Sequence, residues 1–314
     1  MSLSNTSFLT SEQLTRSEID QLFQRARLFK SEYAEKKTIE HLVKESHKIL
    51  ALVFAEPSTR TRMSFQMSAA QLGLRVAILD NPSVASLSKG ETLEDTVRNV
   101  AAMQPDAMVV RFNKDADAEK ALPELSCHII NGGIGTEEHP TQALLDAYTI
   151  QEFHGKVEGE KILIVGDVLH SRVANSNLLL LQKMGAEVAY CAPEAFVPQK
   201  EQWKEVKSFA SLEEGVKWAS VIMGLRVQRE RHVDQGVGLS IAEYREKYRI
   251  GGDQLKFFAK DGILLHPGPV IRGIEFSDYV LSEPRCKVRD QVTNGVFVRA
   301  ALLSFVLGLE VQGA

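Results

Sequence analysis

Residues Ile49 to Arg62 read ILALVF, AEP, STRTR and indicate the class of fold most clearly. The first part of this stretch, Ile49–Phe54, is an apolar run typical of a buried strand, and Pro57 marks the end of that strand. The following residues, Thr59–Leu72, are typical of a helix, with Gly73 at the position of a C-terminal cap. The order strand, turn, helix is the repeating element of an α/β fold.

The same stretch carries two arginines and three hydroxyl groups in five residues, Ser58-Thr-Arg-Thr-Arg62. These residues would lie at the N-terminus of the helix, where backbone N–H groups have no partner inside the helix and the dipole is positive. Together with hydroxyl and guanidinium donors, they predict a phosphate site that needs no glycine-rich loop. The alternative is an ordinary helix cap followed by two solvated arginines.

Strand-like and helix-like segments alternate along almost the whole chain. The predicted strands are Ile49–Phe54, Arg75–Leu79, Ala107–Arg111, His128–Asn131, Lys161–Val165, Glu187–Ala192, Val221–Met223 and Ile263–Leu265. The predicted helices are Ser17–Glu35, Thr59–Leu72, Glu91–Met103, His139–Phe153, Ser171–Met184, Ile241–Tyr248, Asp253–Ala259 and Val292–Leu307. This alternation predicts an α/β protein with two doubly wound parallel-sheet domains, joined by interdomain helices.

The length of 314 residues exceeds the usual size of a single core, so two domains of about 150 residues each are expected. The polar, glycine-containing segment Gln151–Glu160 (QEFHGKVEGE) is the best boundary, because it follows a predicted helix and precedes a predicted strand. We therefore expect domains at 1–150 and 151–291, with the C-terminal helical segment 292–314 packing back on the first.

Composition narrows the classes of function. A net charge of −4 argues against a nucleic-acid surface, and no apolar run approaches the roughly 20 residues of a membrane span. The first residues, Met1–Asn5, lack the features of a secretory signal, and Cys127, Cys191 and Cys286 lack metal-ligand spacing. We expect a cytoplasmic protein with reduced thiols, no metal and no nucleotide-binding or hydrolase motif.

Polar residues recur where predicted strands end. Besides Ser58–Arg62, Arg111 ends one strand, Gly166–Arg172 follows another, and Arg226 lies just beyond a third. Ligands of open α/β sheets bind at the carboxyl ends of the strands. The chemistry of these residues and their expected place in the fold therefore agree on an anion site.

Three further segments have both a functional and a structural interpretation. His139-Pro-Thr-Gln142 opens a helix, so His139 and Gln142 share one face and could both bond a carbonyl or amide; His139 could also merely cap the helix. In Ser86-Leu-Ser-Lys-Gly-Glu91, Lys89 could reach an anion or be a solvated surface charge. His266-Pro-Gly-Pro269 predicts a rigid turn, for which a cis bond is one option, and its carbonyls could face a ligand NH₂ group.

In order and spacing these motifs resemble the aspartate/ornithine carbamoyltransferase family, over about residues 8 to 310. They are Phe54-Ala-Glu-Pro-Ser-Thr-Arg-Thr-Arg62, Ser86-Leu-Ser-Lys-Gly-Glu91, Arg111, His139-Pro-Thr-Gln142, Gly166-Asp167 with Arg172, Leu225-Arg-Val-Gln228 and His266-Pro-Gly-Pro269. The resemblance implies transfer of a carbamoyl group from carbamoyl phosphate to an amino acid, without a metal or organic cofactor. It assigns carbamoyl phosphate to domain 1–150 and the amino acid to domain 151–291.

Within the family the acceptor is expected to be L-aspartate, which gives N-carbamoyl-L-aspartate and phosphate, the committed step of de novo pyrimidine biosynthesis. Relatives that use ornithine bind a cationic side chain and carry His-Cys-Leu-Pro where this chain has His266-Pro-Gly-Pro269. Two departures from the family pattern are Gly268, where some relatives have leucine or alanine, and a single lysine before Gly90, where some have two. Ornithine or another amino acid, or a non-catalytic anion-binding scaffold of the same fold, are the alternatives.

The resemblance also implies a role for each site residue. The phosphate is held by Ser58, Thr59, Arg60, Thr61 and Arg111. Arg60, Thr61 and His139 donate to the carbonyl oxygen, and Gln142 with the Gly268 and Pro269 carbonyls orients the NH₂ group. The aspartate carboxylates are bound by Lys89, Arg172, Arg226 and Gln228. Lys89, with Ser86 or Ser88 as a further candidate, would come from a neighbouring subunit of a homotrimer, and a regulatory chain or dihydroorotase are candidate partners.

Overall fold

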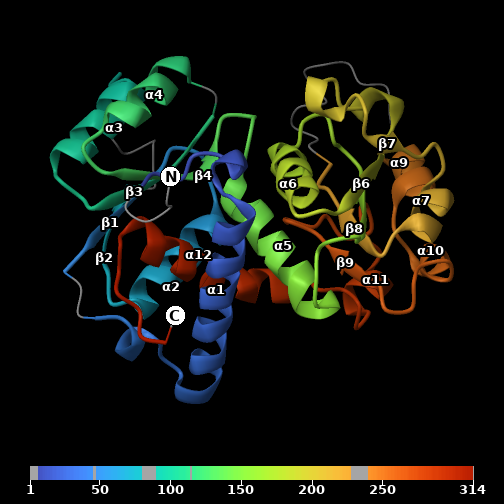
Figure 1. Ribbon diagram of the computed structural model, residues 1–314. Coiled ribbons are helices and arrows are strands. Elements are labelled where there is room, and N and C mark those ends of the chain that lie inside the picture. Colours follow the sequence, from blue (N-terminus) through green and yellow to red (C-terminus); the bar gives the residue numbers. More distant parts are fainter. Residues whose placement is uncertain (1–5, 45–46, 80–89, 114, 228–239, 314) are drawn as a thin grey trace. The chain divides into compact units, whose positions relative to one another are not determined.

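The computed structural model describes residues 6–44, 47–79, 90–113, 115–227 and 240–313 (Figure 1). The chain forms two compact units, called here unit 1 (Met1–Leu145 with Val292–Ala314) and unit 2 (Asp146–Gln291). Two helices, α5 (Pro140–His154) and α12 (Val288–Val306), have residues in both units and therefore connect them. The domain limit predicted from the sequence lies a few residues further along α5.

Unit 1 contains a parallel sheet, whose described strands have the order β2-β1-β3-β4. The strands are β1 (Ile49–Phe54), β2 (Arg75–Leu79), β3 (Ala107–Phe112) and β4 (His128–Ile134). Its helices include α1 (Arg16–Lys36), α2 (Thr59–Gln71), α3 (Leu93–Ala102) and α4 (Ala116–Ala121). On one face of the sheet, Val53 and Val110 pack against Val97 of α3 and Ala118 of α4.

Unit 2 contains a second parallel sheet, with the described strands in the order β7-β6-β5-β8-β9. The strands are β5 (Lys161–Val165), β6 (Glu187–Cys191), β7 (Lys207–Ser208), β8 (Val221–Gly224) and β9 (Ile263–Leu265). Its helices include α6 (Arg172–Lys183), α7 (Leu212–Trp218), α9 (Ile241–Tyr248), α10 (Gly252–Leu255) and α11 (Asp278–Ser282). Leu163 and Ile222 of the sheet pack with Val216 of α7 and Val280 of α11.

These two sheets confirm the predicted α/β class, and every predicted strand is present. The prediction of a helix over Asp253–Ala259 is wrong: α10 ends at Leu255, and Phe257 then donates to the carbonyl three residues back (3.1 Å) in a turn. The sequence prediction also missed α4, α7, α11 and β7. All four are short, so their apolar patterns contain too few residues to show a period.

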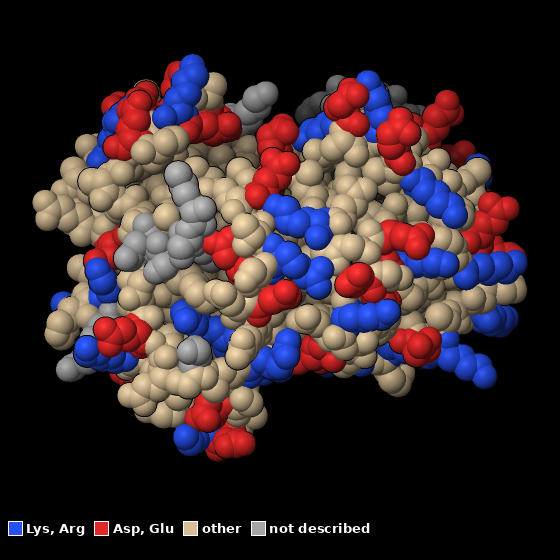
Figure 2. Space-filling view, in the orientation of Figure 1, with Lys and Arg blue, Asp and Glu red and all other residues tan. Residues whose placement is uncertain are grey.

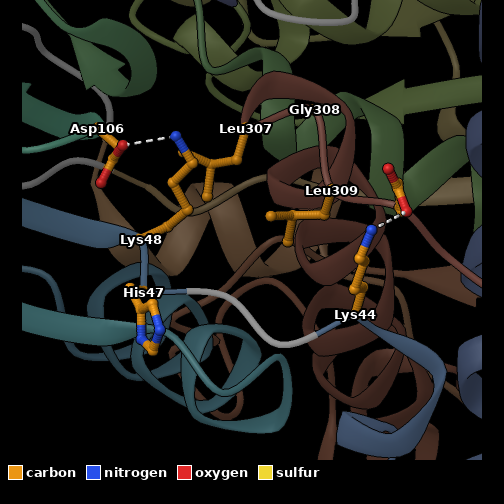
Figure 3. Close-up of a pocket in the computed structure, with 8 residues that line it drawn as sticks. Lys44, His47, Lys48, Asp106, Leu307, Gly308 and Leu309 are labelled. Carbon is orange, nitrogen blue, oxygen red and sulfur yellow. Dashed lines mark hydrogen bonds and ion pairs between the residues drawn. The ribbon is translucent and has the colours of Figure 1, made fainter.

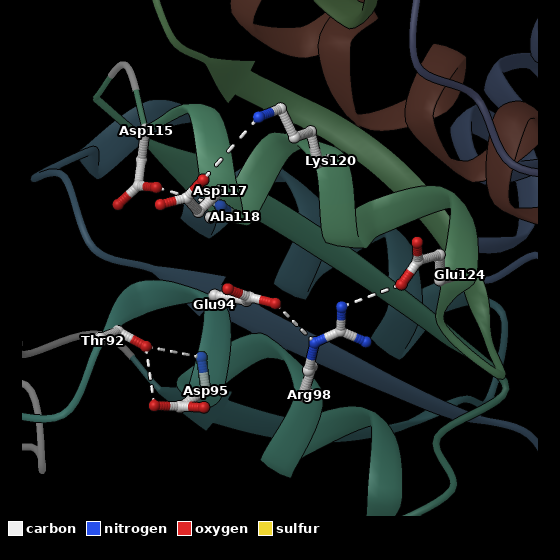
Figure 4. Close-up of polar contacts among 9 residues, drawn as sticks. All are labelled: Thr92, Glu94, Asp95, Arg98, Asp115, Asp117, Ala118, Lys120 and Glu124. Atoms are coloured by element: carbon white, nitrogen blue, oxygen red, sulfur yellow. Dashed lines mark hydrogen bonds and ion pairs between the residues drawn. The ribbon is translucent and has the colours of Figure 1, made fainter.

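In unit 1, α3 and α4 each begin at a side chain that caps the helix (Figure 4). Thr92 accepts a hydrogen bond from the backbone N–H of Asp95 (3.0 Å), so α3 begins later than the predicted residue Glu91. Asp115 accepts in the same way from the N–H of Ala118 (3.0 Å) and starts α4. Such caps satisfy N–H groups that have no partner inside the helix.

The C-terminal part of α12 packs against α2 within unit 1. Ser68 of α2 donates to the backbone oxygen of Val296 (2.7 Å). Arg299, only 3% exposed, donates to the hydroxyl of Ser64 (2.9 Å), and its guanidinium lies over the ring of Phe65. A buried guanidinium needs such partners, because an uncompensated charge in the interior is costly. The contacts therefore fix α12 against the helix that carries the STRTR segment.

Another polar contact joins the amino ends of β1 and β3 (Figure 3). Asp106 accepts from Lys48 Nζ (2.7 Å) and from the backbone N–H of Ile49 (2.8 Å). Partial burial of the Asp106 carboxyl raises its pKa, but the hydrogen bonds from Lys48 and Ile49 outweigh that effect and hold the pKa below its usual value. The carboxylate therefore stabilises the folded state in its ionised form.

We predict that Asp106→Ala lowers the free energy of unfolding by about 1–3 kcal/mol, because two hydrogen bonds to a charged group are lost. The folded pKa lies below the unfolded one, so this contribution is present above the unfolded pKa and disappears as the pH falls through the folded value. Urea unfolding at neutral and acidic pH measures both effects.

The matched control is Glu310→Ala. Lys44 and Glu310 form an ion pair of 3.1 Å beside the same cavity, but their side chains are 73% and 75% exposed. Exposed pairs contribute at most about 1 kcal/mol. An equal loss in the two variants would contradict the account of Asp106.

Candidate functional site

In unit 1 the predicted phosphate residues lie at the switch point of the sheet. The chain runs from β1 to β2 on one side and then continues with β3 on the other side of β1. Ser58–Arg62 directly follows β1, and Arg111 is the penultimate residue of β3. The carboxyl ends of two neighbouring strands at such a reversal are the usual ligand site of an open α/β sheet.

The STRTR segment forms the start of α2, as the sequence predicts. Ser58 occupies the N-cap position, but its side chain makes no capping hydrogen bond, and the first turn contains no acidic residue. Thr59 and Arg60 are exposed, whereas Thr61 is buried. The first turn of α2 is therefore not arranged as an ordinary capped helix start, and its dipole favours an anion.

The structure brings the HPTQ segment together with this helix start. His139 directly precedes α5 and is 5% exposed, and its Nε2 lies 3.3 Å from the hydroxyl of Thr61. Gln142 is also buried, and its backbone N–H donates to the carbonyl of His139 (2.9 Å). Thr61 and His139 thus form a polar pair that can donate hydrogen bonds to one small ligand group.

Arg111 pairs with an acidic residue that the sequence interpretation did not single out. Its Nη2 donates to Glu56 (3.0 Å), and its Nη1 donates to the backbone oxygen of Gly132 (3.3 Å). The pair is largely buried, with side-chain exposures of 12% for Arg111 and 22% for Glu56. The feature of the sequence that could have drawn attention to Glu56 is its place between the end of a strand and Pro57. An anion that binds Arg111 would compete with Glu56.

Unit 2 has its own switch point, between β5 and β8. Arg172 follows β5 as the first residue of α6, which is capped by Ser171 through the N–H of Ala174 (3.1 Å). Arg226 follows β8 and is half-buried. Adjacent strands therefore carry the two arginines predicted to bind carboxylates, and both lie at the carboxyl edge of this sheet.

A third predicted segment of unit 2 follows β9, the neighbour of β8. The peptide bond between Gly268 and Pro269 is cis, which confirms the option raised by the sequence, and Gly268 has a φ of 70°, where glycine is unstrained. The N–H of Gly268 donates to His266 Nδ1 (2.9 Å), and the N–H of His266 donates to Gln291 (2.8 Å). The imidazole of His266 therefore accepts a hydrogen bond from within the turn and stabilises its conformation. Substrate contacts of the Gly268 and Pro269 carbonyls stay a prediction.

Four predicted residues, Ser86, Ser88, Lys89 and Gln228, lie outside the described residues. A cavity of about 380 Å³ in unit 1 lies elsewhere, at the amino ends of β1 and β3, where it is lined by Lys48 and Asp106 among others (Figure 3). Its lysines already have carboxylate partners. The cavity therefore does not belong to the predicted phosphate site.

Acidic and basic side chains are interspersed on the face of the molecule shown in Figure 2. Over the described ranges of the chain, no helix is both long and apolar enough to cross a membrane. Within the same ranges, no group of three or more His, Cys, Asp and Glu side chains could hold a metal ion.

Comparison with known sequences gives a consistent result for both parts of the chain. Residues 6–152 match the carbamoyl-P binding domain of aspartate/ornithine carbamoyltransferase, and residues 158–306 match the Asp/Orn binding domain. The aspartate carbamoyltransferase catalytic subunit of Nitratiruptor sp. is 45% identical over 296 residues, which cover 94% of this chain and 96% of the relative.

Comparison with solved structures leads to the same family as comparison with known sequences. Aspartate transcarbamoylase from Trypanosoma cruzi, in complex with carbamoyl phosphate, matches with a TM-score of 0.87 and 28% identity over 97% of this chain and 96% of that one. Ornithine carbamoyltransferase from Pyrococcus furiosus matches with a TM-score of 0.85 and 29% identity over 98% and 99%. The resemblance seen in the sequence motifs is thereby confirmed, and the chain belongs to the aspartate/ornithine carbamoyltransferase family.

Proposed function

We propose that this protein transfers the carbamoyl group of carbamoyl phosphate to the α-amino group of L-aspartate. The products are N-carbamoyl-L-aspartate and phosphate, and the reaction is the committed step of de novo pyrimidine biosynthesis. The observation that carries the proposal is the contact between Thr61 and the buried His139, at the start of a helix with no acid in its first turn. The relative from Nitratiruptor sp., named an aspartate carbamoyltransferase, supports the same activity.

In unit 1, Ser58, Thr59, Arg60, Thr61 and Arg111 bind the phosphate group in this proposal. The N-terminus of α2 supplies backbone N–H groups and the positive end of its dipole. Arg111 is already paired with Glu56 in this structure, so phosphate must exchange for a carboxylate. A doubly charged phosphate with three oxygens offers more charge-assisted bonds than Glu56 does, which favours the exchange.

In this proposal the reaction depends on electrostatic stabilisation of its transition state and uses no cofactor. The α-amino nitrogen attacks the carbonyl carbon, a C–N bond forms, and the carbonyl oxygen becomes an oxyanion. The bond from carbon to the phosphate oxygen then breaks, phosphate leaves with the electron pair, and the amine loses a proton that phosphate can accept. Arg60, Thr61 and His139 are placed in this proposal as donors to the oxyanion, where the negative charge develops. Gln142 orients the carbamoyl NH₂ group.

In unit 2, Arg172 and Arg226 suit an acceptor with two carboxylates, since a guanidinium binds a carboxylate through two parallel bonds. The cationic side chain of ornithine would be repelled by the same two arginines. The fold alone does not decide between these acceptors, because the ornithine enzyme from Pyrococcus furiosus shares it. The proposal therefore depends on these side chains, with Lys89 and Gln228 as further ligands.

We also propose that the protein is a homotrimer in which Lys89 reaches the site of a neighbouring subunit. Apolar side chains of α2 and of the edge strand β2 support such an interface, because Met63, Met67 and Ile78 are 46%, 47% and 46% exposed in the single chain. Strands of parallel sheets are normally buried on both faces. An apolar edge strand left uncovered is therefore a surface for another chain.

The first prediction from this proposal concerns Arg60. Arg60→Ala should lower kcat by about 100- to 1,000-fold, the loss typical of one oxyanion donor, and leave the fold intact because the side chain is exposed. The rate of carbamoyl-aspartate formation and a thermal melt measure these outcomes. Arg16→Ala is the matched control, since Arg16 also lies in the first turn of a helix and its side chain is 41% exposed. Near-normal turnover of Arg60→Ala would rule out its assigned role.

The second prediction concerns the acceptor. Arg226→Ala and Arg172→Ala should each raise the KM for aspartate and lower turnover, while the Kd for carbamoyl phosphate, measured by calorimetry, stays nearly unchanged. Arg272→Ala is the control in unit 2, because its side chain is 66% exposed and pairs with Asp278 on the surface. Equal weakening of both ligands would show that the substrates are assigned to the wrong units.

The third prediction concerns the shared site. Lys89→Ala and Arg60→Ala chains should each have only residual activity as pure trimers, because every site then lacks one group. After dissociation and mixing, some sites combine an intact Arg60 from one chain with an intact Lys89 from another, and activity should return. Mass measurement establishes that mixed trimers have formed. Mixed trimers without activity would show that Lys89 does not act across a subunit boundary.

A further inference from the structure

Glu275 is a buried carboxylate of unit 2 that no step of the proposed reaction uses. It lies between β9 and α11 and is 2% exposed. One oxygen, Oε1, accepts from the backbone N–H of Val227 (3.0 Å), and the other, Oε2, accepts from the backbone N–H of Ile271 (2.6 Å). A carboxylate this deep in the protein is stable only with such donors, so its position and those of its donors depend on one another.

The two donors belong to the two segments that carry predicted substrate ligands. Val227 directly follows Arg226 in the segment after β8, and Ile271 lies two residues beyond Pro269 in the turn after β9. Glu275 therefore links the acceptor arginine to the HPGP turn through backbone bonds. Neither bond requires a particular side chain at positions 227 and 271, which explains why no motif in those segments points to Glu275.

Glu275 is itself held in place by its backbone. Its carbonyl accepts from the N–H of Ile250 (2.9 Å), and the N–H of Gly273 donates to the carbonyl of Phe276 (2.8 Å), which closes the turn before it. Because the backbone on both sides of Glu275 is hydrogen-bonded, the position of its carboxylate is fixed. It can therefore impose a position on Val227 and Ile271 rather than follow them.

Hydrogen-bond donors and a positive charge lie around the carboxylate. Burial raises the pKa of Glu275 above its usual value, and the N–H groups of Val227 and Ile271 and the charge of Arg226 offset only part of that rise. His266 Nε2 lies 4.0 Å from Oε2. Because His266 Nδ1 accepts from the N–H of Gly268, the neutral ring carries its proton on Nε2, on the side of the carboxylate. Glu275 is thus surrounded by donors and positive charge.

We propose that Glu275 is a positioning residue for the acceptor site: it holds the Arg226 segment and the HPGP turn in the arrangement that binds the amino acid. The proposal rests on the proposed function of this site. Glu275 itself does not touch the substrate. A carboxylate only accepts hydrogen bonds, so a glutamine at this position would turn an NH₂ group toward one of the two N–H donors and replace a bond by a repulsion.

The experiment compares Glu275→Gln, Glu275→Asp and the control Glu160→Gln in the full chain. Glu160 is also a largely buried carboxylate of unit 2, bonded to His154 (2.7 Å) and Ser220 (2.6 Å), but it precedes β5 at the opposite ends of the strands. Replacing Glu160 should therefore lower the free energy of unfolding, but it removes no hydrogen bond to the segment that carries Arg226. For each variant we would measure a thermal melt, the KM for aspartate, kcat, and the Kd for carbamoyl phosphate by calorimetry.

Glu275→Gln is expected to raise the KM for aspartate by about tenfold or more, with less than about a twofold change in the Kd for carbamoyl phosphate. Glu275→Asp keeps the charge and can keep one N–H bond, so it should recover part of the lost affinity. If the glutamine variant does not fold, the aspartate variant carries the same comparison. Glu160→Gln should keep the wild-type KM.

Two results would overturn the inference. One is a wild-type KM for aspartate in folded Glu275 variants. The other is an equal rise of the KM in Glu160→Gln, which would reveal general destabilisation instead of positioning. Wild-type protein separates this inference from the function on which it rests: if it forms no carbamoyl-aspartate, the proposed function itself fails, before any variant is compared.

Discussion

Parallel strand pairing determines which loops and helix starts of this protein lie close together. It places the carboxyl ends of β1, β3 and β4 at one edge of the sheet in unit 1, and those of β5, β8 and β9 at one edge in unit 2. Each predicted ligand group that the structure describes follows or ends a strand at such an edge. Residues far apart in the sequence, such as Thr61 and His139, come into contact only because the sheet aligns those strand ends.

Buried polar groups then hold the loops and helix starts at these edges. In unit 1, Arg299 reaches from α12 to the hydroxyl of Ser64, one turn beyond Thr61 on α2. In unit 2, Glu275 accepts hydrogen bonds from the backbone of the segment after β8 and of the turn after β9. Each group gains stability only when all of its partners are in place, since an unpaired buried charge is unfavourable. The same contacts that stabilise the fold therefore also limit the movement of the binding groups.

The sequence predicts most of this fold because its strands are long apolar runs and its main helices are long enough to show a period. Ile49–Phe54 and Lys161–Val165 form strands with the predicted bounds. Short elements such as α4 and α11 were missed, and the helix predicted over Asp253–Ala259 extends too far, since α10 ends at Leu255. A few residues are too short a stretch to show the spacing of apolar side chains that marks a helix. Ser58–Arg62 and His139 could be found as motifs. Glu56 could not, because its partner Arg111 is distant in the chain, and Glu275 could not, because its donors are backbone N–H groups that leave no motif.

In the proposed function this protein carbamoylates aspartate. The most direct test is a colorimetric assay of wild-type protein supplied with carbamoyl phosphate and either L-aspartate or L-ornithine as the acceptor. We expect formation of N-carbamoyl-L-aspartate and release of an equal amount of phosphate, with little or no citrulline from ornithine. Citrulline as the main product, or no carbamoylated product from either amino acid, would contradict it.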